Sequence, residues 1–183
     1  PDISGRFEGS TVQFDGSLST DADALSDIVS YDWDFGDGTT GSGISPTHVY
    51  GDNGAYEATL TVADSIGAAR SDMVAVEVGN VAPQIVEIPI TTGKAGKPVT
   101  FAAVVEDPGV AENLIYSWDF GDGATASGVD LVAPVHTYSG SGRSNANLTV
   151  TDKDGASAEQ AFDVEVGPPV TFAIDQRTVD EDV

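Results

Sequence analysis

A ten-residue segment occurs twice in this chain of 183 residues. YDWDFGDGTT at Tyr31–Thr40 returns as YSWDFGDGAT at Tyr116–Thr125, so that the two tryptophans lie 85 positions apart. Three further pairs keep the same order in both copies: GSTVQF and GKPVTF, PTHVY and PVHTY, LTVADSIG and LTVTDKDG. Self-similarity at a nearly constant spacing indicates one structural unit that occurs twice. We therefore predict two domains, residues 1–79 and 80–167, and at residues 168–183 a linker with the first strand of an incomplete third unit.

Apolar and polar residues alternate within each repeat. Tyr31, Trp33 and Phe35 are separated by single aspartates, which is the period of a half-buried β-strand. About seven such segments per repeat, separated by Gly, Pro, Asp and Ser, predict an all-β fold. We expect two tandem Ig-like sandwiches, each of seven antiparallel strands. Trp33 and Trp118 stand on apolar positions, so we expect both in the cores and not on a sugar-binding surface.

The charge of the chain narrows the range of partners. It has 30 acidic and 7 basic residues, a net charge of -23, and no cysteine. Without a basic surface it cannot replace the counterions of phosphates, which argues against nucleic acid as a partner. No stretch approaches the ~20 apolar residues that cross a bilayer, so membrane insertion is not expected. The absence of cysteine excludes disulfides and thiolate metal sites.

The repeated motifs resemble those of the polycystic kidney disease (PKD) domain family. The resemblance rests on W-D-F-G-D-G, then P-x-H-x-Y, an L-T-V strand and a D-x-x-G turn, and it covers residues 1–167. It implies a two-sheet sandwich in secreted or cell-surface proteins, including bacterial surface proteins, proteases and polysaccharide hydrolases. One position departs from the pattern, because Ser144 stands where the first repeat has Tyr56. We expect the second sandwich to be less stable, unless a neighbouring side chain fills the gap.

No catalytic constellation accompanies the repeats. His48 and His136 have no nucleophile elbow, cysteine or metal-binding helix motif beside them, so structural roles near a tyrosine are the better interpretation. Asp34 and Asp37 resemble a glycosidase carboxylate pair only in composition, since Asp-Gly is a turn signal. We therefore predict no catalytic residue, no organic cofactor and no enzymatic activity for this chain.

The loop acids are the remaining candidates for a site. In an Ig-like sandwich the loop after the second strand and the last hairpin loop lie at the same end as the N-terminus. Oxygen donors from separate loops are what Ca²⁺ requires, and the family resemblance implies calcium in this region. A solvated acidic rim explains the same residues, so both interpretations stay open. The candidate ligands are Asp21, Asp23, Asp64, Asn80, Glu106, Asp107, Asp152 and Asp154.

Two functions fit these observations. The first is a non-catalytic extracellular spacer or adhesion module, secreted or on a cell surface, that contacts proteins and is stiffened by calcium. The second is an accessory module that helps a secreted protease or polysaccharide hydrolase to engage its substrate. The expected partners are other domains of the same large protein, together with an extracellular protein or polysaccharide.

Overall fold

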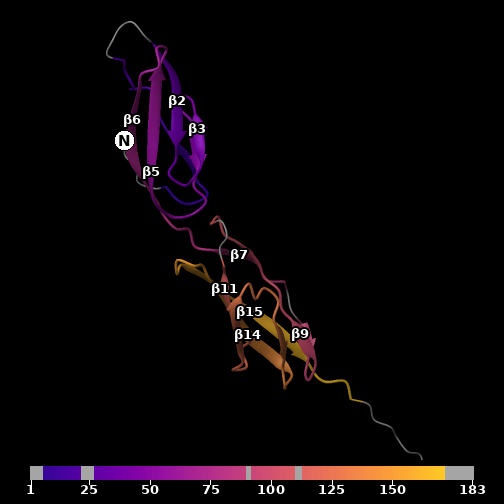
Figure 1. The fold of residues 1–183 in the computed structure, drawn as a ribbon. Helices are drawn as coiled ribbons and strands as arrows, with labels where there is room; N and C mark the ends of the chain where they lie inside the picture. The colour runs from indigo at the N-terminus through magenta and orange to yellow at the C-terminus, as the bar shows by residue number, and fades with distance from the viewer. Residues whose placement is uncertain (1–5, 22–26, 90–91, 110–112, 172–183) are drawn as a thin grey trace, which may run out of the picture. The chain divides into compact units, whose positions relative to one another are not determined.

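The structure is a computed structural model that describes residues 6–21, 27–89, 92–109 and 113–171 (Figure 1). Contacts divide the chain into two compact units. The first unit comprises Pro1–Gln84, Val105–Leu114 and Thr151–Ala158; the second comprises Ile85–Val104, Ile115–Val150 and Glu159–Val183. The first unit therefore contains two loop regions that the sequence assigns to the second repeat. Residues 172–183, where a third unit was predicted to begin, lie outside the described residues.

The first repeat contains six strands in the part of the chain that the structure describes. They are β1 (Thr11–Gln13), β2 (Ile28–Asp34), β3 (Thr40–Ser42), β4 (Thr47–Val49), β5 (Gly54–Asp64) and β6 (Ala69–Val78). One sheet has the order β3-β2-β5-β6 and the other pairs β1 with β4, all antiparallel. A parallel bridge joins Phe7 to Gly79 beside these sheets.

The second repeat follows the same plan with additional short strands. They are β7 (Gln84–Glu87), β8 (Thr92–Lys94), β9 (Pro98–Thr100), β10 (Val104–Glu106), β11 (Ile115–Asp119), β12 (Thr125–Val129), β13 (Val135–Thr137), β14 (Gly142–Thr151) and β15 (Ser157–Gly167). The larger sheet has the order β12-β11-β14-β15-β8, while β13 pairs with β9 and β10 with β7. β8 joins β15 in parallel, with Gly93 opposite Val166. The predicted tandem all-β sandwich fold is confirmed.

Aromatic side chains fill the cores, as the alternation predicts. Trp33 is 5% exposed and Trp118 only 1%, so both tryptophans belong to the interior. The Phe14 ring centroid lies 5.1 Å from those of Trp33 and Phe35. Each indole N–H donates to a backbone carbonyl oxygen, from Trp33 to Gly43 and from Trp118 to Leu131, so the polar edge of the buried ring is satisfied. Burial of both rings confirms that they are not surface platforms for sugars.

The repeated D-F-G-D-G segment is a turn that glycine makes possible. Gly36 has φ of +82°, in the left-handed region that side chains disfavour. A Cβ atom at this position would lie 2.7 Å from the Glu57 carbonyl oxygen, so the space is closed as well. The Asp34 carboxylate accepts the Gly36 N–H at 2.9 Å and closes the turn. The segment is therefore architecture, as the sequence predicts.

In the part of the chain that the structure describes, no helix has the length and apolar character needed to span a membrane.

Candidate functional site

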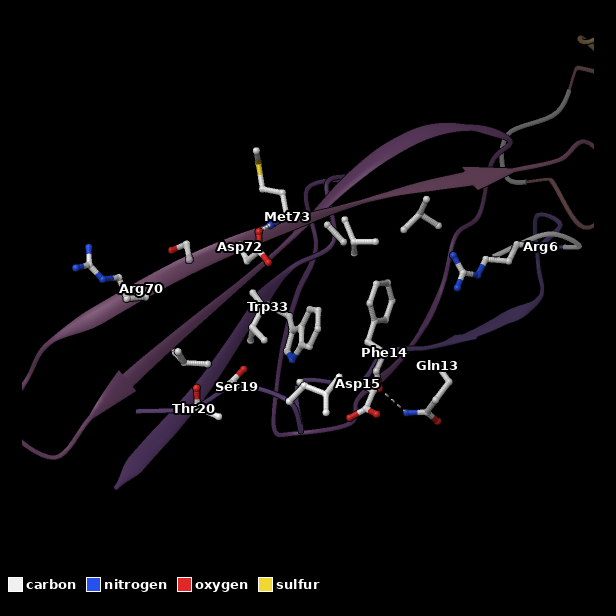
Figure 2. A pocket seen from close by; sticks show the side chains of 18 residues that line it. Arg6, Gln13, Phe14, Asp15, Ser19, Thr20, Trp33, Arg70, Asp72 and Met73 are labelled. Atoms are coloured by element: carbon white, nitrogen blue, oxygen red, sulfur yellow. Dashed lines mark hydrogen bonds between the residues drawn. The ribbon is translucent and has the colours of Figure 1, made fainter. Parts of the chain in front are cut away.

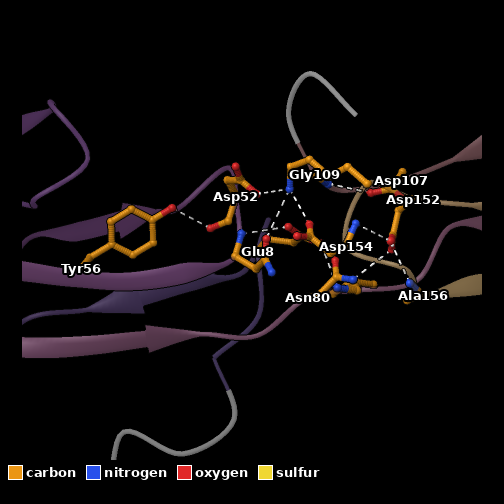
Figure 3. Close-up of polar contacts among 12 residues, drawn as sticks. Glu8, Asp52, Tyr56, Asn80, Asp107, Gly109, Asp152, Asp154 and Ala156 are labelled. Carbon is orange, nitrogen blue, oxygen red and sulfur yellow. Dashed lines mark hydrogen bonds and ion pairs between the residues drawn. The ribbon is translucent and has the colours of Figure 1, made fainter. Parts of the chain in front are cut away.

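Loop side chains of the first compact unit form a network of polar contacts (Figure 3). We call this network the acidic loop cluster. Its members are Glu8, Asp52, Asn53, Asn80, Asp107, Asp152, Lys153 and Asp154. Three of them carry its geometry: Asp152, Asn80 and Glu8.

Asp152 is the buried centre of the cluster. It is 3% exposed and follows β14 at the start of the D-K-D-G turn. Its Oδ1 accepts the N–H groups of Asp154 at 2.9 Å and Ala156 at 2.8 Å, which is how an aspartate closes a tight turn. Its Oδ2 accepts the Asn80 side-chain amide at 2.9 Å. These three donors are neutral, so they satisfy the buried carboxylate without neutralising its charge.

Asn80 and Asp107 add two more oxygen-bearing side chains. Asn80 directly follows the first repeat, and its Oδ1 is buried without a hydrogen-bond partner among the described residues. A buried, unsatisfied amide oxygen costs free energy, so it points to an unrecorded donor or cation. Asp107 follows β10, and its Oδ1 accepts the Gly109 N–H at 2.9 Å. Asn80, Asp107 and Asp152 are side chains of the kind that calcium selects.

Glu8 is a buried acid that sequence analysis did not single out. It is 2% exposed, and its two carboxylate oxygens accept different backbone N–H groups. Oε1 accepts from Val81 at 2.8 Å and Oε2 from Asn53 at 3.0 Å. The second repeat has Ala95 in the equivalent place. A comparison of the two repeats could have revealed Glu8, because an acid stands there at a position where the second repeat has a small apolar residue in its core.

Lys153 provides the positive charge of the cluster. Its Nζ lies 2.7 Å from Asp52 Oδ1 and also contacts Asp154. Sequence analysis placed Asp154 among the candidate ligands but overlooked the adjacent lysine. An ammonium group held between two carboxylates already offsets part of their charge. We therefore assign Asp52 and Asp154 to ion pairing and keep Asn80, Asp107 and Asp152 as the candidate ligands.

The other predicted ligands have different surroundings. Asp64 ends β5, and its Oδ1 accepts the N–H groups of Ile66 and Ala68, each at 2.9 Å, which makes it a turn residue like Asp152. Asp21 and Glu106 are exposed. Asp23 lies outside the described residues. Among the residues that the structure does describe, no group of three or more His, Asp or Glu side chains is arranged to hold a metal ion.

Each repeat also contains an aspartate–histidine pair. His48 Nε2 lies 2.7 Å from Asp37 Oδ2, and its ring stacks on Phe35 with centroids 4.2 Å apart. The predicted hydrogen-bonded position of the histidine near a tyrosine is confirmed, since its ring also packs edge-on against Tyr50, although its aspartate partner was not foreseen. Burial opposes ionisation of Asp37, but hydrogen bonds from Thr39 and His48 outweigh it and hold the pKa of Asp37 below its usual value. Burial, followed by the charge of Asp37, raises the pKa of Tyr50 to about 12.

The same arrangement occurs in the second repeat. His136 Nε2 lies 2.8 Å from Asp122 Oδ2 and stacks on Phe120 at 4.3 Å. Burial opposes ionisation of Asp122 as well, yet hydrogen bonds from His136 and the Ala124 N–H keep its pKa low. Identical geometry in both repeats indicates a structural device.

Sheet order, aromatic cores and paired histidines together define a tandem pair of Ig-like β-sandwich domains. The chain belongs to the PKD domain family, whose model matches residues 5–78 and again residues 80–166.

Curated relatives match short parts of the chain. It is 49% identical over 51 residues to collagenase ColA of Bacillus cereus, which covers 28% of this chain and 5% of that protein. It is 46% identical over 59 residues to a microbial collagenase of Vibrio alginolyticus, with 32% and 7% covered. It is 38% identical over 81 residues to the pre-pro-metalloprotease PrtV of Vibrio cholerae, with 43% and 8% covered. The matched segments therefore cover less than a tenth of the length of these relatives.

Solved structures of similar fold include the PKD1 domain of Vibrio anguillarum Epp. That domain is 30% identical, matches 50% of this chain and 100% of its own length, and gives a TM-score of 0.40. The four N-terminal Ig domains of Dscam1 are 16% identical, with 88% of this chain and 42% of that chain covered and a TM-score of 0.49.

Proposed function

We propose that this chain is a non-catalytic spacer and adhesion segment of a larger extracellular protein. The observation that carries the proposal is the anchoring of the linker between the two repeats. Asn80 is bound through its side chain to Asp152, and Val81 is bound through its N–H to Glu8. Both contacts lie within the first compact unit, so they fix the start of the segment that follows the first repeat, which suits a spacer.

We propose further that calcium stabilises the acidic loop cluster. The unpaired Asn80 Oδ1 and the buried charge of Asp152 support this assignment, with Asp107 as a third oxygen donor. Backbone carbonyl groups and water would complete the six to eight oxygens that the ion needs. The bound ion would neutralise carboxylates that otherwise repel one another in a chain of net charge -23.

Calorimetry and thermal unfolding with and without calcium test this proposal. We expect binding with a dissociation constant of about 10⁻⁴ to 10⁻³ M, as in extracellular modules, and a higher unfolding midpoint in millimolar calcium than in EDTA. Asp152→Asn should abolish both effects. Asp119→Asn is the matched control, because Asp119 also closes a turn, onto the Gly121 N–H, but lies outside the cluster. Equal midpoints in calcium and EDTA for the wild-type chain would refute the assignment.

The alternative function is an accessory substrate-binding module. Three curated relatives carry the names collagenase or metalloprotease, which favours a place beside a protease in the complete protein. Sedimentation with insoluble collagen, chitin or cellulose separates the two functions. A segment that contacts only other domains of its own protein should remain in the supernatant, whereas retention on one of these solids that free ligand competes away would favour the accessory role.

A further inference from the structure

A groove lies against the inner face of the four-stranded sheet of the first repeat (Figure 2). It has a volume of about 640 Å³, and we call it the first-repeat groove. That volume is within the range of about 300 to 1,000 Å³ that is typical of ligand sites. Its apolar lining residues include Trp33, Leu60, Val62 and Val74, none of which belongs to the acidic loop cluster.

The apolar residues of this groove are less covered than their counterparts in the second repeat. Leu60 and Val62 on β5 are half-buried. Leu148 and Val150 stand 88 positions later, on the equivalent strand β14, and both are 0% exposed. The same fold therefore buries this part of the core in one repeat and leaves it partly exposed in the other. A partner that covers the exposed part would gain free energy from the apolar area that it removes from water.

A phenylalanine ring of the second repeat indicates the size of the missing group. Phe162 on β15 takes the place that Val74 has on β6, again 88 positions apart. Its ring centroid lies 6.1 Å from that of Phe101 and 6.2 Å from that of Trp118. Valine lacks the ring with which to make such contacts. An aromatic side chain from a partner therefore matches this position of the first repeat in size and in packing.

Positive charge at the groove restricts the partner further. Arg6 and Arg70 are the only basic residues among residues 1–79, and both line the groove. Figure 2 shows them toward opposite ends, with Trp33 between them. Within the described part of the chain, neither guanidinium group forms an ion pair. Both are therefore available to a carboxylate from outside the chain.

Two acids also line the groove, and each is bound to the backbone. Asp15 Oδ1 accepts the Ser17 N–H at 2.9 Å, and Asp72 Oδ1 accepts the Met73 N–H at 2.9 Å. The two acids balance the two arginines in charge, in a repeat that is otherwise strongly acidic. An acidic segment is therefore repelled less at the groove than elsewhere on this repeat.

We propose that the first-repeat groove binds an aromatic side chain of a protein partner that has an acidic residue on each side of it in its sequence. The ring lies over Leu60, Val62 and Val74, as Phe162 lies against the core of the second repeat. The flanking carboxylates pair with the arginines at the two ends of the groove. The inference is independent of calcium and of the spacer function.

The peptide acetyl-Glu-Gly-Phe-Gly-Glu-amide tests the site on the complete chain. Met73 is the only methionine and lines the groove, as Trp33 does, so the Met73 methyl and Trp33 indole N–H resonances report on binding. We expect saturable shifts of both, with a dissociation constant of about 1 mM or lower, and no shift of the Trp118 indole. A peptide with alanine in place of phenylalanine should bind about tenfold more weakly or worse. Absence of shifts, or equal binding of the alanine peptide, overturns the proposal.

The flanking charges provide a test whose sign separates the groove from the rest of the chain. The net charge of -23 by itself would make an acidic peptide bind more weakly than its neutral analogue. We expect the reverse, so that a peptide with glutamine in place of both glutamates binds about threefold to tenfold more weakly. Arg70→Gln should reduce this preference, whereas Arg143→Gln, the same change of charge in the second repeat, should leave it unchanged. Equal or tighter binding of the glutamine peptide overturns the proposal.

Two variants of neighbouring residues locate the ring. Val74→Phe places the phenylalanine of the second repeat in the groove and should abolish peptide binding. Ala75→Phe adds the same ring at the next, exposed position of β6 and should leave binding unchanged. Shifts that persist in Val74→Phe overturn the proposal. If binding appears only after residues 22–26 are replaced by glycine and serine, those residues are the occupant and the proposal is likewise wrong.

Discussion

The two repeats share a fold but place their aromatic rings differently. The first has Tyr56 and Val74 where the second has Ser144 and Phe162. Tyr56 stacks on Tyr50 with centroids 4.3 Å apart, and its hydroxyl group donates to the Asp52 carbonyl oxygen at 2.8 Å. Phe162 instead packs edge-on against Trp118. The first repeat therefore has its additional ring beside the buried Tyr50, and the second has its additional ring against Trp118. The absence of a Tyr56 counterpart in the second repeat need not mean that its core is weaker.

What does not differ is equally instructive. Both repeats keep the turn aspartate, the stacked histidine and the buried tyrosine in the same relation. Tyr50 and Tyr138 each donate to a phenylalanine carbonyl oxygen at 2.9 Å, to Phe35 and Phe120 respectively. The contacts that the two repeats share are polar contacts with nearly equal distances, whereas their apolar contacts differ.

The largest expected effect comes from Tyr56→Ser, which gives the first repeat the residue of the second. Loss of the ring stack and of the hydroxyl hydrogen bond should lower the free energy of unfolding of the first repeat by about 3 kcal/mol. Urea titrations followed by the indole N–H resonances of Trp33 and Trp118 report on each repeat separately. The Trp118 resonance should show an unchanged midpoint. Ser144→Tyr, the reverse change, is the control and should stabilise the second repeat if the two environments are equivalent.

Phe162→Val, the next effect in size, opens the second core. We expect a loss of about 2 kcal/mol in the second repeat, because the ring's contacts with Phe101 and Trp118 disappear and a cavity remains. The Trp118 resonance in the same urea titration measures it. An equal loss of stability in the first repeat, followed by the Trp33 resonance, would show that the two cores do not unfold independently.

Tyr50→Phe and Tyr138→Phe should lower stability by similar amounts. Each hydroxyl group donates to the carbonyl oxygen of the equivalent phenylalanine in its own repeat. Each removes the donor to a buried carbonyl oxygen and should cost about 1.5 kcal/mol in its own repeat. Thermal unfolding of the two variants compares them directly. A difference of more than about 1 kcal/mol would show that the tyrosines are not equivalent.

Acid should weaken both repeats through the aspartate–histidine pairs. The pKa values of Asp37 and Asp122 are lower in the folded chain than the ordinary 3.8. Each carboxylate therefore stabilises the fold above about pH 4, and this contribution disappears as the pH falls through the folded pKa. Asp37→Asn should cost about 1 kcal/mol at pH 6, and the cost should become progressively smaller as the pH falls below about 4. Unfolding midpoints measured from pH 6 downward test this; a difference between wild type and variant that stays constant with pH would argue against ionisation as its source.

The smallest expected effect is that of Lys153→Met. The Lys153 side chain is 35% exposed and that of its partner Asp52 is 41% exposed, so water screens the ion pair. The change in stability should be below about 0.5 kcal/mol. Denaturation at low and high salt measures it. A loss above 1 kcal/mol would mean that the acidic loop cluster depends on this lysine far more than its exposure indicates.

The fold was accessible from sequence because its signals are local. Alternation, Asp-Gly turns and the spacing of the motifs predicted two β-sandwiches with buried tryptophans. Part of the candidate site was accessible as well: Asn80 and Asp152 were among the predicted ligands, and a hydrogen bond joins their side chains. Glu8 and Lys153 were missed, because nothing near them in the chain reveals their partners. Val81 is 73 positions from Glu8, and Asp52 is 101 positions from Lys153.

The sequence by itself determined the period of the strands, the two repeats and the aromatic residues that fill each core. Those properties depend on neighbouring residues and on the pleat of a strand. Only the tertiary structure decided which acid meets which donor and where the additional aromatic ring of each repeat packs. The physical reason is that a polar contact, or the packing of a ring between two sheets, depends on the path of distant segments. The effect of exchanging Val74 for the ring of Phe162 therefore depends on which residues that path places opposite it.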